Sequence, residues 1–126
     1  MLPRLSRLER IIGTECVESF SKKCVLVLGV GGVGGYVVEG LARSGVGKLI
    51  IVDFDTVDES NINRQIIALG STIGRLKVDV LEERIKDINP DCVVVKNSNF
   101  IDENNFKEMI KNKFSSFVIE KSFQIP

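Results

Sequence analysis

The chain has 126 residues, in which 17 lysines and arginines balance 17 aspartates and glutamates. This length allows one domain with its own hydrophobic core, and the content of 44% hydrophobic and 27% charged residues excludes a disordered or fibrous protein. The zero net charge excludes an overall basic surface for nucleic acid and leaves open only a local basic patch.

The N-terminal segment, residues 1–22, is predicted to form two short helices outside the main sheet. Charged residues interrupt it, so it lacks the apolar core of a signal peptide, and no apolar run in the chain is long enough to span a membrane. The three cysteines, Cys16, Cys24 and Cys92, form no Cys-x-x-Cys pair, so neither a metal site nor a disulfide is predicted. These features favour a cytoplasmic protein.

A strand, a glycine-rich turn, a helix and a second strand then follow in the order of a βαβ unit. Residues 24–28 form a continuous aliphatic run, which is typical of a strand buried on both faces of a parallel sheet. Residues 36–43 continue as a helix, and residues 48–53 form the second strand. This order predicts an α/β fold with a Rossmann-like, mainly parallel sheet and flanking helices.

The second half of the chain alternates between polar connections and regular elements. Residues 55–71 lack periodicity, which predicts a long functional loop with a short helix at 64–68. Apolar residues then recur at spacings of three and four, which predicts a helix that ends at Asn89 and Pro90. The remaining expectations are a strand at 92–95, a polar helix at 102–112 and a strand at 117–119.

The glycine-rich turn is the first candidate for a binding site. Three of its glycines, Gly29, Gly31 and Gly34, have the Gly-x-Gly-x-x-Gly spacing between a strand and a helix, where a phosphate can approach the backbone. Asp53 ends the next strand, where a carboxylate can bind ribose hydroxyls. The alternative is a tight turn that only allows close packing, with Asp53 a solvated residue. By itself the motif also fits NAD or FAD.

Four short motifs in order resemble the ThiF-like superfamily of activating enzymes for ubiquitin-like and sulfur-carrier proteins. They are Gly-x-Gly-Gly-x-Gly from Gly29, Val-Asp-Phe-Asp from Val52, Asn-x-x-Arg-Gln from Asn61 and Gly-x-x-Lys from Gly74. The resemblance covers residues 7–91. Within the superfamily, the sequences of residues 41–47, 61–67 and 83–90 are most similar to those of the tRNA threonylcarbamoyladenosine dehydratases. These enzymes use ATP to activate a carboxylate on a modified adenosine of tRNA and close it to a cyclic ester.

The resemblance implies an ATP site with Mg²⁺ and a set of residues to form it. The nucleotide-binding residues are Gly29, Gly31, Gly32, Gly34, Asp53, Asp55, Asn61, Arg64 and Lys77, and the catalytic residues are Arg64, Lys77 and Arg7. Arg64 and Lys77 carry the positive charge that departing pyrophosphate requires. Arg7 would reach the ATP site of a partner subunit, which implies a homodimer. The plainer interpretation is that these charges are solvated and that Asn61 caps a turn.

The resemblance breaks down after the fourth strand. Relatives carry an Asp-x-x-Asp pattern there that helps to hold magnesium, whereas Glu120 takes the first acidic position here and Phe123 the second. The family also continues for another half-domain or more. We therefore expect residues 1–126 to be a single, truncated ThiF-type domain, the N-terminal portion of a larger one.

Several functions fit these observations. The first is cyclisation of threonylcarbamoyladenosine in tRNA, and a close alternative is an adenylyltransferase acting on the C-terminus of a ubiquitin-like sulfur-carrier protein. A nicotinamide-dependent oxidoreductase fits the glycine turn but not Asn61, Arg64 and Lys77. A nucleotide-binding or dimerisation module without activity of its own fits the early end of the chain.

Overall fold

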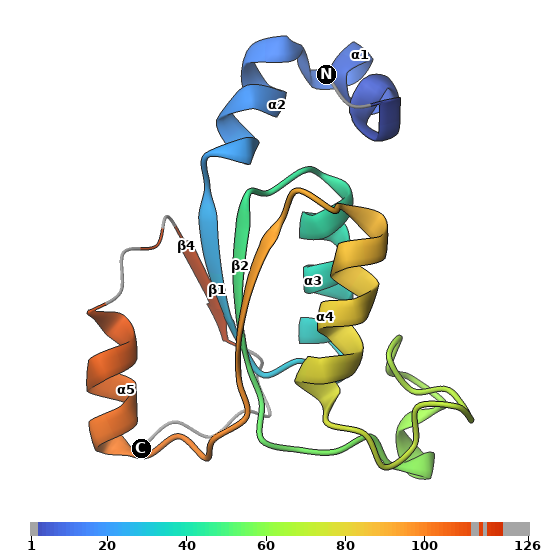
Figure 1. The fold of residues 1–126 in the computed structure, drawn as a ribbon, viewed down its shortest axis with the longest axis vertical. Coiled ribbons are helices and arrows are strands. Elements are labelled where there is room, and N and C mark those ends of the chain that lie inside the picture. The colour runs from blue at the N-terminus through green and yellow to red at the C-terminus, as the bar shows by residue number, and fades with distance from the viewer. Residues whose placement is uncertain (1–2, 112–113, 115, 120–126) are drawn as a thin grey trace.

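The computed structural model describes residues 3–111, 114 and 116–119 of the chain. In this part, four parallel strands form one sheet with helices on both faces (Figure 1). The strands are β1 (Cys24–Leu28), β2 (Lys48–Val52), β3 (Val93–Asn97) and β4 (Ser116–Ile119), in the order β3-β2-β1-β4. The predicted Rossmann-like fold is confirmed.

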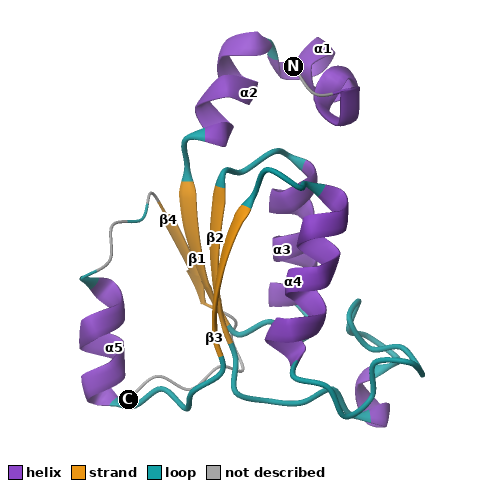
Figure 2. Ribbon diagram, viewed as in Figure 1, coloured by secondary structure: helices purple, strands orange, loops and turns teal. Residues whose placement is uncertain are grey.

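The helices lie in three places around the sheet (Figure 2). α3 (Gly34–Arg43) and α4 (Lys77–Ile88) cover one face, and α5 (Glu103–Ile110) covers the other. α1 (Ser6–Ile12) and α2 (Thr14–Ser21), preceded by the 3₁₀ helix η1 (Pro3–Leu5), lie beyond the amino ends of the strands. No helix among the described residues is long and apolar enough to cross a membrane.

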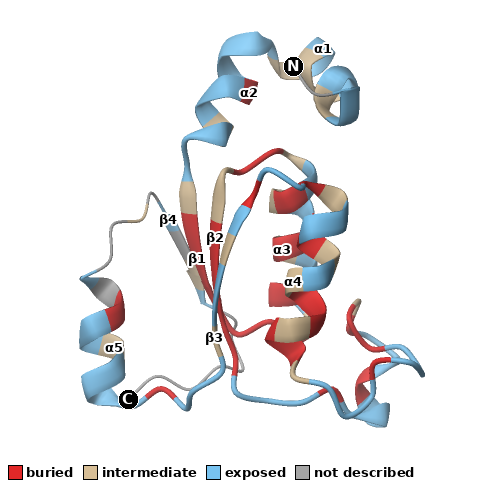
Figure 3. Ribbon diagram, in the orientation of Figure 1, coloured by how far each residue is buried: buried red, intermediate tan, exposed pale blue. Residues whose placement is uncertain are grey.

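Alternation along the strands gives the sheet a hydrophobic core on each face. Val27 and Ile51 face α3 and α4, where they join Leu81 and Ile85 of α4. Leu26, by contrast, faces α5 and belongs to a smaller second core. The two central strands, β1 and β2, are accordingly deeply buried, whereas β3 at the edge of the sheet is largely exposed (Figure 3). Burial of each such side chain contributes about 1.5–3 kcal/mol relative to its exposed state.

A buried carboxylate joins the two helices of the larger core. Glu39 of α3 accepts hydrogen bonds from Arg84 Nε of α4 at 2.6 Å and from Arg43 Nε at 3.0 Å. Burial acts to raise the pKa of Glu39, but the hydrogen bonds and charges of the two arginines outweigh it and hold the pKa below its usual value. Glu39 is therefore ionised in the folded protein at neutral pH and ties α3 to α4.

The N-terminal helices are anchored at the amino edge of the sheet. Arg4 Nη1 donates to the carbonyl oxygens of Asp87 at 2.6 Å and Ile88 at 3.1 Å, which lie in the last turn of α4. A guanidinium in this position satisfies carbonyls that the helix leaves unpaired and complements its negative dipole end. Leu5 packs on Gly45, where a Cβ would come within 2.9 Å of Leu5 Cδ1.

Candidate functional site

The turn between β1 and α3 depends on glycine for both its backbone shape and its packing. Gly29 has φ +88°, which disfavours other residues, and its N–H donates to Val52 O at 2.8 Å. A Cβ at Gly34 would lie 1.8 Å from Gly29 O. The glycines thus bring the start of α3 directly onto the end of β1, at the carboxyl edge of the sheet (Figure 1).

Other glycines of the turn have different surroundings. A Cβ at Gly32 would meet no atom within 4 Å, so packing does not require glycine at this position. Gly31 is buried. A Cβ at Gly35 would lie 3.3 Å from Val30 O and 3.4 Å from Ile66 Cγ2, which shows that the polar loop packs against the start of α3. The open space at Gly32 leaves room for a ligand to approach the backbone.

Asp53 fastens the glycine turn to the end of β2. One carboxylate oxygen accepts the N–H of Val30 at 3.0 Å, and the other accepts the N–H of Asp55 at 2.8 Å. Burial raises the pKa of Asp53, although both hydrogen bonds and the charge of Lys77 oppose the rise. A carboxylate oxygen has a second lone pair, so Asp53 can still accept a ribose hydroxyl while it holds the turn.

Lys77 is the positive charge that the structure brings beside Asp53 and Asp55. Its N–H donates to Asp55 O at 3.1 Å, and its Nζ lies 3.8 Å from Asp55 Oδ2. The side chain is only 7% exposed, which contradicts the plain interpretation of Lys77 as a solvated surface charge. A buried ammonium requires compensating negative charge, and an ion pair as long as 3.8 Å leaves room for a stronger anionic partner.

The polar loop after β2 folds differently from the prediction. The expected helix at 64–68 is absent, and a short 3₁₀ helix, Glu59–Asn61, is found instead, followed by turns. Asp58 explains the shift, because its carboxylate accepts the N–H of Ser60 at 2.9 Å and its own N–H donates to Asn61 Oδ1 at 2.8 Å. This capping pattern starts the helix at the Asp-x-x-Asn signal, upstream of the predicted start.

Asn61 and Arg64 are less closely connected to the glycine turn. Asn61 is buried and its side-chain oxygen closes the cap on Asp58, so the plain interpretation as a turn residue applies to it at least in part. Arg64 is exposed, and its Nη1 donates to Ser60 O and Asn63 Oδ1, both at 3.0 Å. The interactions of Arg64 among the described residues are thus within its own loop.

Gln65 was assigned no role from the sequence. It is only 7% exposed, and its Oε1 has no hydrogen-bond partner among the described residues. This oxygen can accept a hydrogen bond from a water or a ligand. Its position directly after Arg64 in the Asn-x-x-Arg-Gln motif is the sequence feature that could have identified Gln65 as a candidate.

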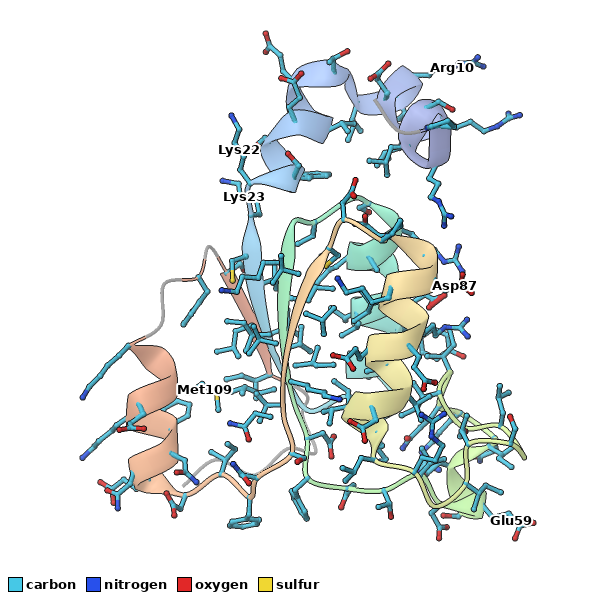
Figure 4. All side chains as sticks on the ribbon, viewed as in Figure 1. Arg10, Lys22, Lys23, Glu59, Asp87 and Met109 are labelled. Carbon is cyan, nitrogen blue, oxygen red and sulfur yellow. The ribbon has the colours of Figure 1, made fainter. Side chains whose placement is uncertain are left out.

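Arg7 lies far from these residues. It belongs to α1, at the amino edge of the sheet, whereas the polar loop lies at the carboxyl edge. The labelled residues Arg10 of α1 and Glu59 of the loop mark these opposite ends (Figure 4). The structure therefore groups the glycine turn with Asp53, Asp55 and Lys77, and it places Arg7 elsewhere.

No metal site is visible in the part of the chain that the structure describes. No group of three or more histidine, cysteine, aspartate or glutamate residues there is close enough to hold an ion. No disulfide joins Cys16, Cys24 and Cys92. Glu120 and Phe123, which the resemblance assigns to the two expected acidic positions, lie outside the described residues.

The sheet order, the glycine turn and the strand-end carboxylate together define a Rossmann-type nucleotide-binding fold. The pattern of the ThiF family matches residues 4–119, and the chain belongs to this family.

Three relatives illustrate the similarity. The tRNA threonylcarbamoyladenosine dehydratase of Bacillus subtilis (strain 168) is 49% identical over 108 residues, which are 86% of this chain and 42% of that protein. The enzyme of the same name from Haemophilus influenzae is 39% identical over 93% of this chain and 44% of its own length. A crystal structure of E. coli TcdA in complex with ATP has a TM-score of 0.89 at 34% identity, over 92% of this chain and 48% of that one. The chain spans less than half the length of these relatives.

Proposed function

We propose that this chain is the nucleotide-binding part of an enzyme that uses ATP to activate a carboxylate, and that the carboxylate belongs to threonylcarbamoyladenosine in tRNA. The observation that carries the proposal is the buried Lys77, held beside Asp53 and Asp55 at the glycine turn. The names of the two bacterial relatives and the ATP complex of TcdA support the substrates. Because tRNA is the proposed acceptor, we also propose action in the cytoplasm.

In the proposed reaction, a carboxylate oxygen of the acceptor forms a bond to the α-phosphorus of ATP, and the bond from that phosphorus to the pyrophosphate breaks. Negative charge grows on the leaving pyrophosphate, so a fixed positive charge lowers the barrier. Lys77 provides such a charge in a site with little water, where it acts more strongly than in solvent. Arg64 would turn from its loop contacts to the phosphates, and Asn61 would donate to the ribose or the α-phosphate.

Mg²⁺ is part of the proposal through the chemistry of the triphosphate, which this hard cation usually accompanies. It would neutralise part of the negative charge on the phosphates. Among the described acids at this edge, Asp53 accepts two N–H groups and Asp55 Oδ2 lies 3.8 Å from Lys77 Nζ. The remaining candidate ligand, Glu120, is outside the described residues.

A homodimer is also proposed, because of where the structure places Arg7. Arg7 belongs to α1, which lies beyond the amino ends of the strands and therefore at the opposite edge of the sheet from the glycine turn (Figure 1). It can act on a nucleotide only in a second copy. Light scattering on the protein tests this point, and a fully active monomer would contradict it.

A sulfur-carrier or ubiquitin-like protein remains the second candidate acceptor. Relatives named ubiquitin-like modifier-activating enzyme 5 match the chain at up to 38% identity. They match 83–85% of this chain, so membership of the family does not separate the two acceptors. The higher identity to the dehydratase, 49%, favours tRNA.

Binding of ATP and NAD to this chain, measured by titration calorimetry, tests the nucleotide. We expect ATP to bind more tightly than NAD, because Lys77 offers a second phosphate partner beyond the glycine turn. Lys77→Met keeps the buried volume but removes the charge, and should weaken ATP binding by about tenfold or more. Lys96→Met is the matched control, since Lys96 pairs with Asp79 and Glu82 on the surface of α4. Tighter binding of NAD would overturn the proposal.

Exchange of pyrophosphate into ATP tests the catalytic roles. Arg64→Ala should slow exchange by about a hundredfold while leaving stability nearly unchanged, because Arg64 is exposed. Asp53→Ala should weaken nucleotide binding and also destabilise the fold, because its carboxylate holds two backbone N–H groups. An unchanged exchange rate in Arg64→Ala would show that Arg64 is an ordinary surface residue.

A further inference from the structure

A cavity lies at the amino edge of the sheet, between the N-terminal segment and the two helices of the larger core. Its volume is about 440 Å³, within the range of small-molecule sites. Arg4 and Leu5 of η1 line it, together with the last residues of α3 and the end of α4. Figure 4 places Asp87 of α4 at this edge. The cavity lies across the sheet from the glycine turn, so its ligand is not a reactant bound at that turn.

Two guanidinium groups with unused donors line the cavity. Arg4 uses its Nη1 for two carbonyl oxygens of α4, and its Nε and Nη2 make no hydrogen bond among the described residues. Arg43 contacts Glu39 through Nε and Nη2, which leaves its Nη1, and the side chain is 59% exposed. Glu39 also pairs with Arg84, so these three groups retain one positive charge. Guanidinium N–H groups in such a position can bind a carboxylate.

Acceptor groups line the same cavity. Asp87 is exposed, and its carboxylate forms no ion pair with another described residue. Asn89 is only 7% exposed, its Nδ2 donates to Val46 O over a long 3.4 Å, and no described group donates to its Oδ1. The carboxyl ends of α3 and α4 add the negative ends of two helix dipoles. Carboxylate and amide oxygens accept N–H groups, so this part of the lining can bind an ammonium group.

The charges around the cavity nearly cancel. Arg4 and Arg43 supply two positive charges and Asp87 supplies one negative charge, while the two helix ends together contribute about one more. A ligand without net charge therefore fits better than a simple anion or cation. Leu5 and Ile88 give the lining an apolar part. A molecule that carries a carboxylate, an ammonium group and an apolar side chain matches all of these groups.

We propose that this cavity binds a free amino acid with an aliphatic side chain. Its α-carboxylate accepts N–H groups of Arg4 and Arg43, and its α-ammonium group donates to Asp87 and to Asn89 Oδ1. The apolar part of the lining contacts the side chain. A peptide terminus carries only one of the two charges and would leave one set of partners unmatched. This site is independent of the proposed function, because it requires no nucleotide.

The first experiment compares three ligands. L-leucine carries both charges, N-acetyl-L-leucine lacks the ammonium group and L-leucinamide lacks the carboxylate. Two-dimensional NMR titration gives the dissociation constants, and the amide signals that move locate the ligand. We expect L-leucine to bind about tenfold more tightly than either analogue, with the shifts concentrated in η1 and the last turns of α3 and α4. Equal or tighter binding of an analogue would assign the cavity to a peptide terminus and overturn the proposal.

The second experiment removes one charge at a time. Arg43→Gln should weaken L-leucine binding about tenfold or more and leave L-leucinamide binding unchanged, because leucinamide has no carboxylate. Asp87→Asn should weaken L-leucine binding to a similar extent and leave N-acetyl-L-leucine binding unchanged. Arg75→Gln is the matched control for Arg43→Gln, since Arg75 also pairs with a glutamate, Glu83, but does not line the cavity. Circular dichroism checks that each variant is folded.

The remaining outcomes also decide the question. If no amide signal of the unmodified chain moves with L-leucine, the proposal is wrong. If L-leucine binds and neither variant weakens it, the ligand lies elsewhere and the cavity is not its site. Equal losses of L-leucine and of the analogue that lacks the matching charge would show that the residue shapes the cavity instead of binding that charge, which also overturns the proposal. None of these results bears on ATP, so the nucleotide proposal is tested separately.

Discussion

Replacement of Gly34 by alanine should damage the fold at the glycine turn. The new Cβ would lie 1.8 Å from Gly29 O, so the two atoms must separate by roughly 1 Å or more. Gly29 cannot yield easily, because it has φ +88° and its N–H is bonded to Val52 O. Overpacking lowers the free energy of unfolding by about 1–3 kcal/mol, and the higher helix propensity of alanine raises it by up to about 1 kcal/mol. Because Gly29 O is held in place, we expect the free energy of unfolding to fall by about 2–3 kcal/mol in total.

Thermal unfolding followed by circular dichroism measures this loss. For a chain of this size, about 2–3 kcal/mol corresponds to a fall in Tm of roughly 8–12 °C. Gly32→Ala is the matched control, because its Cβ meets no atom within 4 Å, and its Tm should remain within about 2 °C of the parent. Gly32→Ala should nevertheless weaken ATP binding, since the methyl group enters the space proposed for phosphate. An unchanged Tm for Gly34→Ala would refute the packing argument.

Two further predictions concern the helices. Glu39→Gln should cost about 1–2 kcal/mol at pH 7, as the arginines lose their ionised partner. The folded pKa of Glu39 is lowered, so its contribution is present above the unfolded value of about 4.3 and is lost as the pH falls through the folded pKa. Urea unfolding should therefore show that the difference in unfolding free energy between the original chain and Glu39→Gln is smaller below pH 4 than at pH 7. An equal difference at pH 7 and below pH 4 would contradict this. Arg4→Ala should lower the free energy of unfolding by about 0.5–1.5 kcal/mol, because two hydrogen bonds to the end of α4 are lost. Amide exchange should become faster in α1 but not in α3. Unchanged exchange in α1 would show that Arg4 does not anchor this helix.

The sheet could be predicted from the sequence because its strands are continuous apolar runs. The predicted strand at 24–28 has the observed bounds of β1, and the helix that ends before Asn89 was found through its apolar spacing. The polar loop has no such periodicity. There the helix begins where the side chains of Asp58 and Asn61 cap it. It is therefore found at Glu59–Asn61 and not at the predicted residues 64–68.

The site was predictable in part. The glycine spacing and Asp53 depend on a local strand, turn and helix, so the motif located them. The burial of Lys77 depends on how α4 docks beneath the loop that carries Asp55, and no local pattern reports it. The rings of Phe54 and Phe100, which follow the ends of β2 and β3, are 46 positions apart in the sequence and meet only because these two strands are neighbours. A linear sequence motif does not identify residues that only the order of the strands brings together.

The sheet order also implies a sequence of events in folding. Leu26 of β1 pairs with Ile50 of β2 across about 24 positions, whereas it pairs with Phe117 of β4 across about 91. Closing the longer loop costs about 1 kcal/mol more in chain entropy. We therefore expect β1, β2 and β3 to assemble with α3 and α4 first, and β4 to dock afterwards against an edge of β1 that is already formed. On the ribosome, β1, β2 and β3 would also leave the exit tunnel before β4 does.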